Sequence, residues 1–347
     1  MEELSRIGID TSKSVFQVHG VNASEQPVLR RKLRRQQMLP FFGRLAPTKI
    51  GIEACGAAHY WARELKGLGH EVVLLPPQYV KPYVKRGKND AADAEAICEA
   101  MSRPTMRFVA VKTADSQAAL MLGGLRERLG RDRIRLANTI RGYAAEFGLV
   151  APKGKANIEP LLTCLTTDER VPVLAREMFG ELAKEYAWTC AQLERLEAKQ
   201  LAWHRSNELS RRLARIPGIG PVTASMLAMK APDPQAFRSG RRFAAWLGLT
   251  PKDHSTAGKQ RLGVITRAGD EALRSLLVVG ATAVIWQVRR GTARSPSPWL
   301  LALLKRKPPK LAAVALANKM ARIAWKLMAT GESYDARRIL PAASVAA

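Results

Sequence analysis

Four acidic residues near the N-terminus have the types and spacing that could bind a divalent metal. Asp10 ends an apolar run, Ile7-Gly8-Ile9-Asp10, and Glu53 lies inside a second one at residues 49–55. Asp90 and Asp93 are three residues apart, so they share one face of a predicted helix. A carboxylate inside an apolar strand is costly to desolvate and needs a partner or a metal. Four oxygen ligands from three elements would suit a pair of Mg²⁺ ions that holds a phosphodiester.

Three residues of this set also have simpler explanations. Asp10 alone could begin a turn at the end of a strand. Asn89 or Asp90 could cap the helix, and Asp93 could be solvated at its positive end. Glu53 is harder to explain in this way, because its neighbours are apolar or small. The four residues together, in this order, are much more specific than any one of them.

The composition indicates a large globular protein with a polyanionic partner. The 347 residues are enough for two or three domains, and 47% of them are hydrophobic. The 56 basic residues exceed the 30 acidic ones, which gives a formal net charge of +26. This excess favours nucleic acid over an anionic membrane, because the sequence has no apolar run of about 18 residues and opens with no signal peptide. We therefore expect no membrane association.

The cysteines carry no sign of a metal site or a disulfide framework. No C-x-x-C pair occurs, and no histidines cluster beside the four cysteines, Cys55, Cys98, Cys164 and Cys190. Reduced thiols in a bacterial cytoplasm are the expectation.

Basic residues gather in two places. A short run, RRKLRR, occupies residues 30–35, and residues 272–331 contain eleven Lys and Arg but no Asp or Glu. An ordinary solvated surface mixes both signs, so the longer stretch predicts contact with nucleic acid. The eleven include Arg294 and Lys310, and the contacts that we single out are Arg289, Arg290, Lys305, Arg306 and Lys307.

Short apolar runs alternate with helical patterns between residues 5 and 112, which is typical of an α/β domain. Their order and length suit a ribonuclease H-like sheet, in which metal ligands gather at strand ends and on one helix. Predicted strands cover residues 6–21, 26–34, 49–55, 71–76 and 106–111, with a hairpin turn at 22–25. Predicted helices cover residues 36–45, 57–68 and 90–102.

Residues 114–147 predict one long charged helix, because Leu and Ile recur at helical spacing between Arg and Glu. Gly123 and Gly124 would weaken its early part by roughly 1 kcal/mol each relative to alanine. After a loop at 151–157, a second charged helix is predicted from about 168 to 209. The pair favours a helical arm or a coiled coil. A compact helical insertion packed on the first domain is the alternative.

A third segment begins near residue 211 and contains IPGIGPVTA at 216–224. This motif resembles the hairpin of helix-hairpin-helix DNA-binding modules. Gly218 and Gly220 would let the backbone approach a phosphate, and amides at the following helix start could hold it. A plain turn between two helices is the alternative.

Residues 243–259 predict a helix that stops at Gly248 and a loop that presents Ser255 beside small residues. Three cations, Lys259, Arg261 and Arg267, follow closely. A serine ringed by cations could attack a phosphodiester, because the cations would stabilise the developing charge. A serine and a glycine in a basic loop could equally just bind phosphate, so the spacing leaves both roles open.

These motifs together resemble those of the DEDD transposases of the insertion-sequence one-hundred-ten class, the bridge-RNA-guided recombinases of bacterial mobile elements. The resemblance covers nearly the whole chain and departs from the family at Gly123-Gly124, where members keep a more regular helix. In the N-terminal half it rests on IGID at 7–10, GIE at 51–53 and KNDAADA at 88–94. In the C-terminal half it rests on IPGIG at 216–220, GLTP at 248–251, HSTAGK at 254–259 and GVITRAGD at 263–270.

The resemblance implies an activity, a set of site residues and several partners. The activity is site-specific DNA strand exchange, and the partners are donor and target DNA, a structured guide RNA and further copies of the chain, as a dimer to a tetramer. The setting is the bacterial cytoplasm, at the nucleoid. The implied domains are a RuvC-like domain at 1–113, a coiled-coil arm at 114–209, a mainly helical transposase domain at 210–334 and a tail at 335–347. The implied site residues are Asp10, Glu53, Asp90 and Asp93 for two Mg²⁺ ions, and a nucleophile matched to Ser255, with Ser239 as the fallback.

Three other functions fit parts of the pattern. A Holliday-junction resolvase would use the same carboxylates with water as the nucleophile, and Ser255→Ala should leave its cutting intact. The segment Asp10-Thr11-Ser12-Lys13 resembles the phosphate loop of sugar kinases, but the net charge of +26 and the lack of an adenosine-binding glycine motif argue against that class. The third is a non-catalytic nucleic-acid-binding protein with a decayed site, although all four carboxylates are present.

Overall fold

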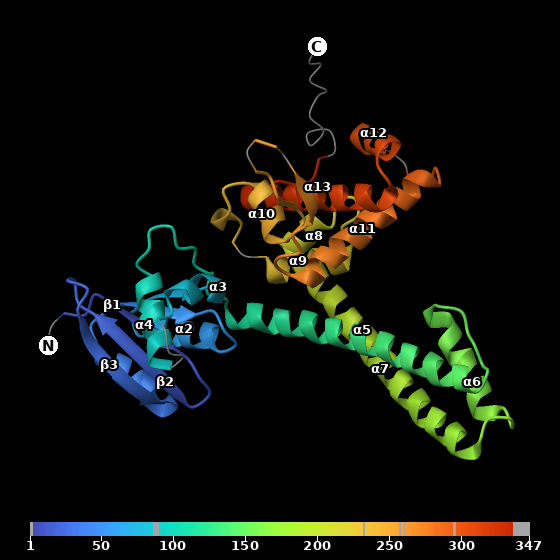
Figure 1. Cartoon of the computed structure of the whole chain (residues 1–347), viewed down its shortest axis with the longest axis horizontal. Coiled ribbons are helices and arrows are strands. Elements are labelled where there is room, and N and C mark those ends of the chain that lie inside the picture. The colour runs from blue at the N-terminus through green and yellow to red at the C-terminus, as the bar shows by residue number, and fades with distance from the viewer. Residues whose placement is uncertain are drawn as a thin grey trace, which may run out of the picture. The chain divides into compact units, whose positions relative to one another are not determined.

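The computed structural model describes residues 3–85, 90–231, 233–256, 258–259, 261–293 and 296–335. It divides into two compact units, Met1–Ala118 and Ala119–Ala347, and Figure 1 labels most of their helices and three of their strands. Lys88 and Asn89 of the motif at 88–94 lie outside the described residues, as does the predicted tail beyond Asp335.

The N-terminal unit is built on a five-stranded sheet with the order β3-β2-β1-β4-β5, of which Figure 1 labels β1, β2 and β3. β1, β2 and β3 are antiparallel neighbours, whereas β4 and β5 run parallel to β1. This mixed sheet, with helices between its parallel strands, confirms the predicted α/β class. The strands are β1 (Arg6–Asp10), β2 (Val15–Val21), β3 (Pro27–Arg34), β4 (Lys49–Glu53) and β5 (Glu71–Leu75).

Helices cover both faces of this sheet. On one face, α1 (Met38–Phe42) and α2 (Ala58–Gly67) share a core with the strand isoleucines, and Trp61 meets the Phe16 ring edge-on at 5.0 Å. On the other face lies α4 (Asp90–Ala100), which packs against β1, β2 and β4. Its approach is close because the strands present Gly8 and Gly51 to it. The short elements are η1 (Arg35–Gln37), α3 (Pro77–Val80) and η2 (Lys81–Tyr83).

Two strand predictions were wrong. The run at 6–21 is two antiparallel strands, because the polar residues after Asp10 form a turn in which the Ser12 hydroxyl accepts the Val15 amide proton at 3.0 Å. The residues at 106–111 form no strand. They contribute a single bridge, in which the Val109 amide donates to the Leu74 carbonyl at 2.8 Å.

Two long helices, α5 (Ala114–Glu146) and α7 (Val173–Ser206), dominate the first part of the C-terminal unit (Figure 1). An ion pair between Arg126 and Glu197, at 2.8 Å, joins them. Their far ends share a core with α6 (Ile158–Thr167), which the sequence analysis missed. The predicted second helix therefore starts too early, because the chain turns between α6 and α7 and resumes at Pro172. A short η3 (Lys155–Asn157) precedes α6.

Gly123 has a packing role that the sequence analysis did not foresee. α5 runs unbroken through it, and a Cβ at this position would come within 2.8 Å of the Met226 sulfur. The glycine therefore lets α5 lie close to α9 (Pro221–Lys230). No heavy atom lies within 4 Å of the corresponding position at Gly124.

The rest of the C-terminal unit is a mainly helical body. Its core is formed by α11 and α13, with alanines such as Ala281, Ala317 and Ala321 fully buried. Small residues at these positions let the helix backbones approach closely. A two-stranded antiparallel hairpin, β6 (Pro251–Asp253) and β7 (Leu262–Ile265), joins α10 to α11. The helices are α8 (Glu208–Leu213), α9, α10 (Gly240–Trp246), α11 (Glu271–Arg289), α12 (Pro298–Arg306) and α13 (Pro309–Thr330), with η4 (Pro234–Ala236).

α11 is long and apolar enough, by length and composition, to cross a membrane. In this fold one face of it is a core face, because Leu273, Leu277, Ala281 and Ile285 are buried at a spacing of four residues. Val279 and Trp286 lie on its exposed part. The stripe shows how a helix of this composition packs in a helical body.

Candidate active site

Strand pairing brings two of the predicted carboxylates to one edge of the sheet. Ile9 of β1 lies opposite Ile52 of β4, so the next residue on each of these parallel strands, Asp10 and Glu53, follows at the same level. Both side chains are partly buried. A Cβ at Gly8 would lie 2.2 Å from the Ala94 carbonyl oxygen, so only glycine lets α4 come this close.

The start of α4 brings the other two carboxylates to the same place. Asp90 is its first residue and Asp93 lies one turn later. Ligand oxygens of Asp10, Asp90 and Asp93 all lie within 4.8 Å of one another. Glu53 stands outside this tight group, but its charge acts on Asp10 and is itself affected by Asp93. The structure thus places all four residues in one neighbourhood.

The electrostatics of this cluster are those of crowded like charges. The pKa of Asp10 is raised to about 6, mainly by burial and then by the charges of Asp93, Asp90 and Glu53. The pKa of Glu53 is raised by burial and by Asp93. The ion pairs found in the described part of this unit join other residues, so they leave this negative charge uncompensated.

A bound divalent cation would relieve this repulsion. All the candidate ligand atoms are carboxylate oxygens, the donors that hard cations such as Mg²⁺ prefer. Three of them already converge from a strand end and a helix start, and the fourth lies beside them. The residues present therefore fit a divalent metal.

Ser255 lies in the segment that connects β6 and β7, where the sequence analysis expected a loop. Its hydroxyl accepts a hydrogen bond from the Arg261 amide at 3.0 Å, and its own amide donates to Asp253 Oδ1 at 2.9 Å. Hydrogen bonds from the Ser255 hydroxyl and amide hold the pKa of Asp253 below its usual value. Asp253 thus holds the backbone of Ser255 through a hydrogen bond, a contact that sequence reasoning missed.

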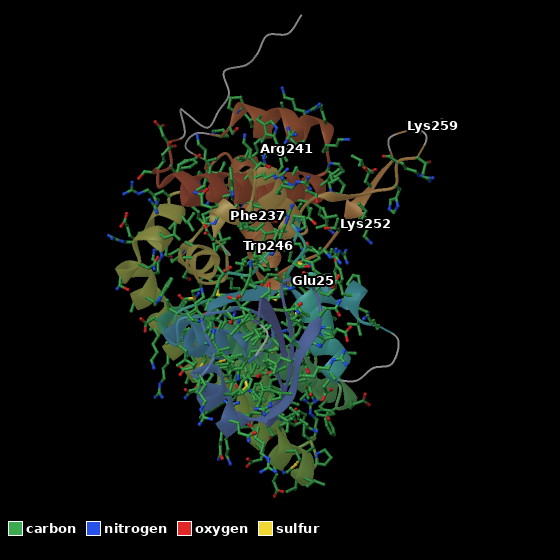
Figure 2. The ribbon with its side chains drawn as sticks, turned by 90° about the vertical axis from the view of Figure 1, so that its left-hand side faces the viewer. Glu25, Phe237, Arg241, Trp246, Lys252 and Lys259 are labelled. Atoms are coloured by element: carbon green, nitrogen blue, oxygen red, sulfur yellow. The ribbon has the colours of Figure 1, made fainter. Side chains whose placement is uncertain are left out.

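The hairpin carries its cations on the outside. Figure 2 shows Lys252 near its base and Lys259 near its tip, extending away from the helical body that holds Phe237 and Trp246. Lys259, Arg261 and Arg267 are all exposed. They are thus available to phosphates near Ser255.

Ser239, the fallback nucleophile, lies in a different setting. It precedes α10 and lines a cavity of about 1380 Å³ between α10, the hairpin and α13. The lining of this cavity is largely apolar, and no Asp or Glu is among its described residues. Burial lowers the pKa of Lys319, whose ammonium lies 4.4 Å from the centre of the Trp299 ring. The lining cations are Arg241, Arg267, Lys310, Lys319, Arg322 and Lys326.

Of these six cations, sequence reasoning chose Arg267 as a phosphate contact and named Lys310 as a member of the acid-free stretch. The signal that could have identified more was the absence of acidic residues between 272 and 331, because four of the six lie in that stretch. The cations chosen there, Arg289 and Arg290 at the end of α11 and Lys305, Arg306 and Lys307 at the end of α12, are exposed but lie outside the cavity lining.

The two glycines of the IPGIG motif have different surroundings. Gly218 has a φ of 87°, and a Cβ there would come within 3.0 Å of the Gly280 carbonyl oxygen on α11. Gly220 is exposed, with nothing within 4 Å of its Cβ position. Gly218 therefore serves helix packing, and Gly220 leaves space at the start of α9.

Comparison with known proteins matches two segments of the chain to transposase family profiles and finds similar transposases. Residues 7–147 match a family profile of the DEDD IS110 type described as "Transposase", and residues 210–296 match "Transposase IS116/IS110/IS902 family". The chain is 64% identical, over 96% of its length and 86% of the relative, to "Putative transposase y4pF/y4sB" of Sinorhizobium fredii. It is 50% identical to "Probable family 20 transposase" of Pseudomonas aeruginosa, over 95% of the chain and 98% of the relative. It is 39% identical to "Transposase for insertion sequence element IS1328" of Yersinia enterocolitica, over 96% of the chain and the whole relative.

Proposed function

The chain belongs to the IS116/IS110/IS902 family of transposases, and from this premise we propose that it exchanges DNA strands through a metal-dependent carboxylate site and a serine nucleophile. The resemblance inferred from its motifs is confirmed, and the protein is a DNA transposase of the insertion-sequence type. The observation that carries the finer proposal is the convergence of Asp10, Asp90 and Asp93 within 4.8 Å, with Glu53 nearby.

In the proposed chemistry Ser255 attacks a phosphorus atom of the DNA backbone. The bond from Ser255 Oγ to phosphorus forms as the bond to one DNA oxygen breaks, and that oxygen leaves as a hydroxyl with the proton that the serine gives up. A hydroxyl of an incoming strand then attacks the phosphoserine and restores the serine. The number of phosphate ester bonds is unchanged, so joining needs no ATP.

The carboxylates would hold Mg²⁺, with two ions as the proposed number, and this metal would stabilise the negative charge of the pentacovalent phosphate. Asp10 and Glu53 are held by neighbouring strands, and Asp90 and Asp93 by the start of α4. The fold therefore holds these four residues together, where a metal bound by them would orient a scissile phosphate. Lys259, Arg261 and Arg267 would neutralise the phosphates on either side of Ser255.

The proposal extends to partners and to the division of the chain. A structured RNA encoded by the element would choose donor and target sequences by base pairing, while the protein reads backbone and shape. Two to four copies would assemble, with composite sites shared between protomers, on DNA in the bacterial cytoplasm. We keep the division into a RuvC-like domain (1–113), a coiled-coil arm (114–209), a transposase domain with a helix-hairpin-helix-like motif (210–334) and a tail.

The test is to trap the covalent intermediate. The full chain, purified with its co-purifying RNA, is incubated with Mg²⁺ and labelled DNA that spans the element junction, and denaturing gels report cleavage and protein-bound DNA. The expected result is a protein–DNA adduct that Ser255→Ala and Asp10→Asn abolish and Ser239→Ala preserves. Sequencing of the RNA should recover one species with loops complementary to the junction.

Two alternatives give other results. A resolvase that uses water would cut DNA without an adduct, and Ser255→Ala would keep cutting. Ser239 is the second candidate nucleophile, because it lines a cavity rich in cations. If the adduct is lost only in Ser239→Ala, the nucleophile is Ser239 and Ser255 is a phosphate contact.

A further inference from the structure

We propose that the cations of strand β3, Arg30, Lys32 and Arg34, bind the phosphates of the DNA strand that enters the carboxylate site. We call these three residues the β3 row. They belong to the basic run at 30–35, which has no part in the chemistry described above. The proposal rests on the proposed function, because it supplies a path for that substrate.

Strand pairing places the β3 row level with the carboxylates. Lys32 lies opposite Gln17 of β2, and Gln17 lies opposite Asp10 of β1. Residues directly opposite each other in a sheet point to the same face. Lys32, Gln17 and Asp10 therefore form one line across three strands, and Glu53 continues it on β4.

The distances along this line suit a DNA strand. Neighbouring strands lie about 4.8 Å apart, so the backbone of Lys32 is roughly 10 Å from that of Asp10. Arg30 and Arg34 stand two residues on either side of Lys32, at intervals of about 7 Å along β3. A strand whose phosphates contact this row would thus pass within reach of the carboxylates.

The side chains of the β3 row are available for such contacts. All three residues are exposed, and none takes part in an ion pair among the described residues. Arg30 has only a small charge effect on Glu95 of α4, whose pKa is lowered mainly by its hydrogen bond with Lys85. Three like charges side by side repel one another, and a polyanion would remove that repulsion.

The other two arginines of the run lie on the opposite face and already have partners. The Arg31 guanidinium stands 5.5 Å from the centre of the Phe41 ring. The Arg35 guanidinium stands 5.0 Å from the Trp61 ring and 5.9 Å from the Tyr60 ring. The alternation of the strand thus divides one basic run into a free row beside the carboxylates and a pair engaged with aromatic rings.

β3 is also an edge strand, and charged residues on an edge can simply prevent pairing with another sheet. Charges that only prevent such pairing could lie on either face of β3, whereas charges that bind the DNA strand must lie on the carboxylate face. A matched pair of variants separates the two roles. Arg30→Gln/Lys32→Gln removes two charges from the carboxylate face, and Arg31→Gln/Arg35→Gln removes two from the other face.

The experiment measures binding of a short fluorescein-labelled single-stranded oligodeoxynucleotide to the full chain by anisotropy, in EDTA and over a series of salt concentrations. Loss of two phosphate contacts should reduce the slope of log affinity against log salt by about 1.4, and weaken binding about tenfold at moderate salt. The Arg31→Gln/Arg35→Gln variant should keep the slope of the wild type. An equal reduction in both variants would overturn the proposal, because it would leave only general positive charge. A reduction seen with an RNA oligonucleotide but not with DNA would overturn it as well.

Asp10→Asn separates this test from the test of the proposed function. The binding experiment contains no divalent metal, so Asp10→Asn should bind with the slope of the wild type even though it cannot cut. If Asp10→Asn still cuts DNA, the proposed function fails, whatever the β3 row does. If Asp10→Asn is inactive and the row variant keeps its full slope, the row proposal fails alone. Thermal unfolding of each variant establishes that it is folded.

Discussion

The carboxylate site and the serine hairpin are built in opposite ways. Asp10 and Glu53 continue strands whose isoleucines are fully buried, and α4 is held against those strands through Gly8. Ser255 lies in a two-stranded hairpin whose strand residues are nearly all exposed. The first site is positioned by the core of its unit, whereas the second is positioned by a few local hydrogen bonds. Substitutions at the first should therefore affect folding and chemistry together, and substitutions at the second should affect chemistry alone.

The hairpin is nevertheless firmly attached at its base. Gly248 and Gly269 both have positive φ, and a Cβ at either would come within 2.2 Å of a backbone carbonyl oxygen. Arg274 of α11 donates hydrogen bonds to the carbonyls of Leu247 and Ala268 at 3.2 and 3.0 Å. The base of the hairpin is thus fixed by close backbone packing and by Arg274, whereas Ser255 is held by its hydrogen bonds with Asp253 and Arg261.

The largest expected effect is a loss of strand-transfer activity at the hairpin without a loss of stability. Ser255→Ala should lower the rate of strand transfer by at least about 10³-fold, because it removes the nucleophile. Its free energy of unfolding should stay within about 0.5 kcal/mol of the wild type, because the side chain is exposed. Single-turnover assays and urea titrations measure the two quantities. Ser239→Ala is the control, and a large loss of stability in Ser255→Ala would contradict the comparison.

At the carboxylate site, in contrast, one substitution should change both stability and metal binding. Gly8→Ala should destabilise the N-terminal unit by about 3 kcal/mol, because its Cβ would meet backbone atoms of Ala94 and Cys98, which cannot move alone. The shift of α4 would separate Asp90 and Asp93 from Asp10, so binding of a divalent metal should weaken as well. Calorimetric titration with Mg²⁺ and thermal unfolding measure both effects.

Gly56→Ala is the matched control for that variant. Gly56 follows Glu53 closely in sequence, and nothing lies within 4 Å of the position of its Cβ. It should change neither stability nor metal binding by more than the experimental error. If Gly8→Ala behaves in the same way, α4 is not held by this contact.

A smaller effect is the dependence of Mg²⁺ affinity on pH at the carboxylate site. The raised pKa of Asp10, about 6, means that a bound metal must displace a proton when the pH is near or below that value. The affinity for Mg²⁺ should be constant above about pH 7 and fall by up to tenfold per pH unit below about 6. Calorimetry in buffers of different protonation enthalpy should detect proton release near pH 6. Release that is the same in Asp10→Asn would exclude Asp10 as its source.

The sequence predicted best what depends on local periodicity and on strand ends. The i, i+3 spacing of Asp90 and Asp93 placed them on one face of a helix, and the structure has them at the start of α4. The apolar runs before Asp10 and around Glu53 predicted two strands, which the sheet contains. Family motifs then identified the transposase class, which the matches to known proteins confirm.

What could not be predicted depends on contacts between distant residues. The turn after Asp10 is stabilised by a hydrogen bond from the Val15 amide to the Ser12 hydroxyl. Val109 forms only an isolated bridge with Leu74. Gly123 looked like a weak point of α5 until Met226 of a distant helix was seen packed against it. The cavity beside Ser239 combines residues from 239 to 326, so no local pattern could reveal it.

The smallest expected effect is a gain in stability from removing a carboxylate. Because the pKa of Asp10 is raised in the folded chain, its ionised form destabilises the fold. The stability associated with this group is fully present below the unfolded pKa of 3.8 and is lost as the pH rises through about 6. A shift of this size corresponds to at most about 3 kcal/mol, and partial exposure reduces it, so Asp10→Asn should gain about 1 kcal/mol at pH 7.5 in EDTA. The gain should vanish near pH 4, and saturating Mg²⁺ should reverse it, because only the wild type then has its full set of ligands.

Urea titrations at pH 7.5 in EDTA, near pH 4 and in saturating Mg²⁺ measure this difference in stability. An Asp10→Asn variant that is less stable than the wild type in EDTA would show that protein groups compensate the charge of Asp10, so that it needs no metal.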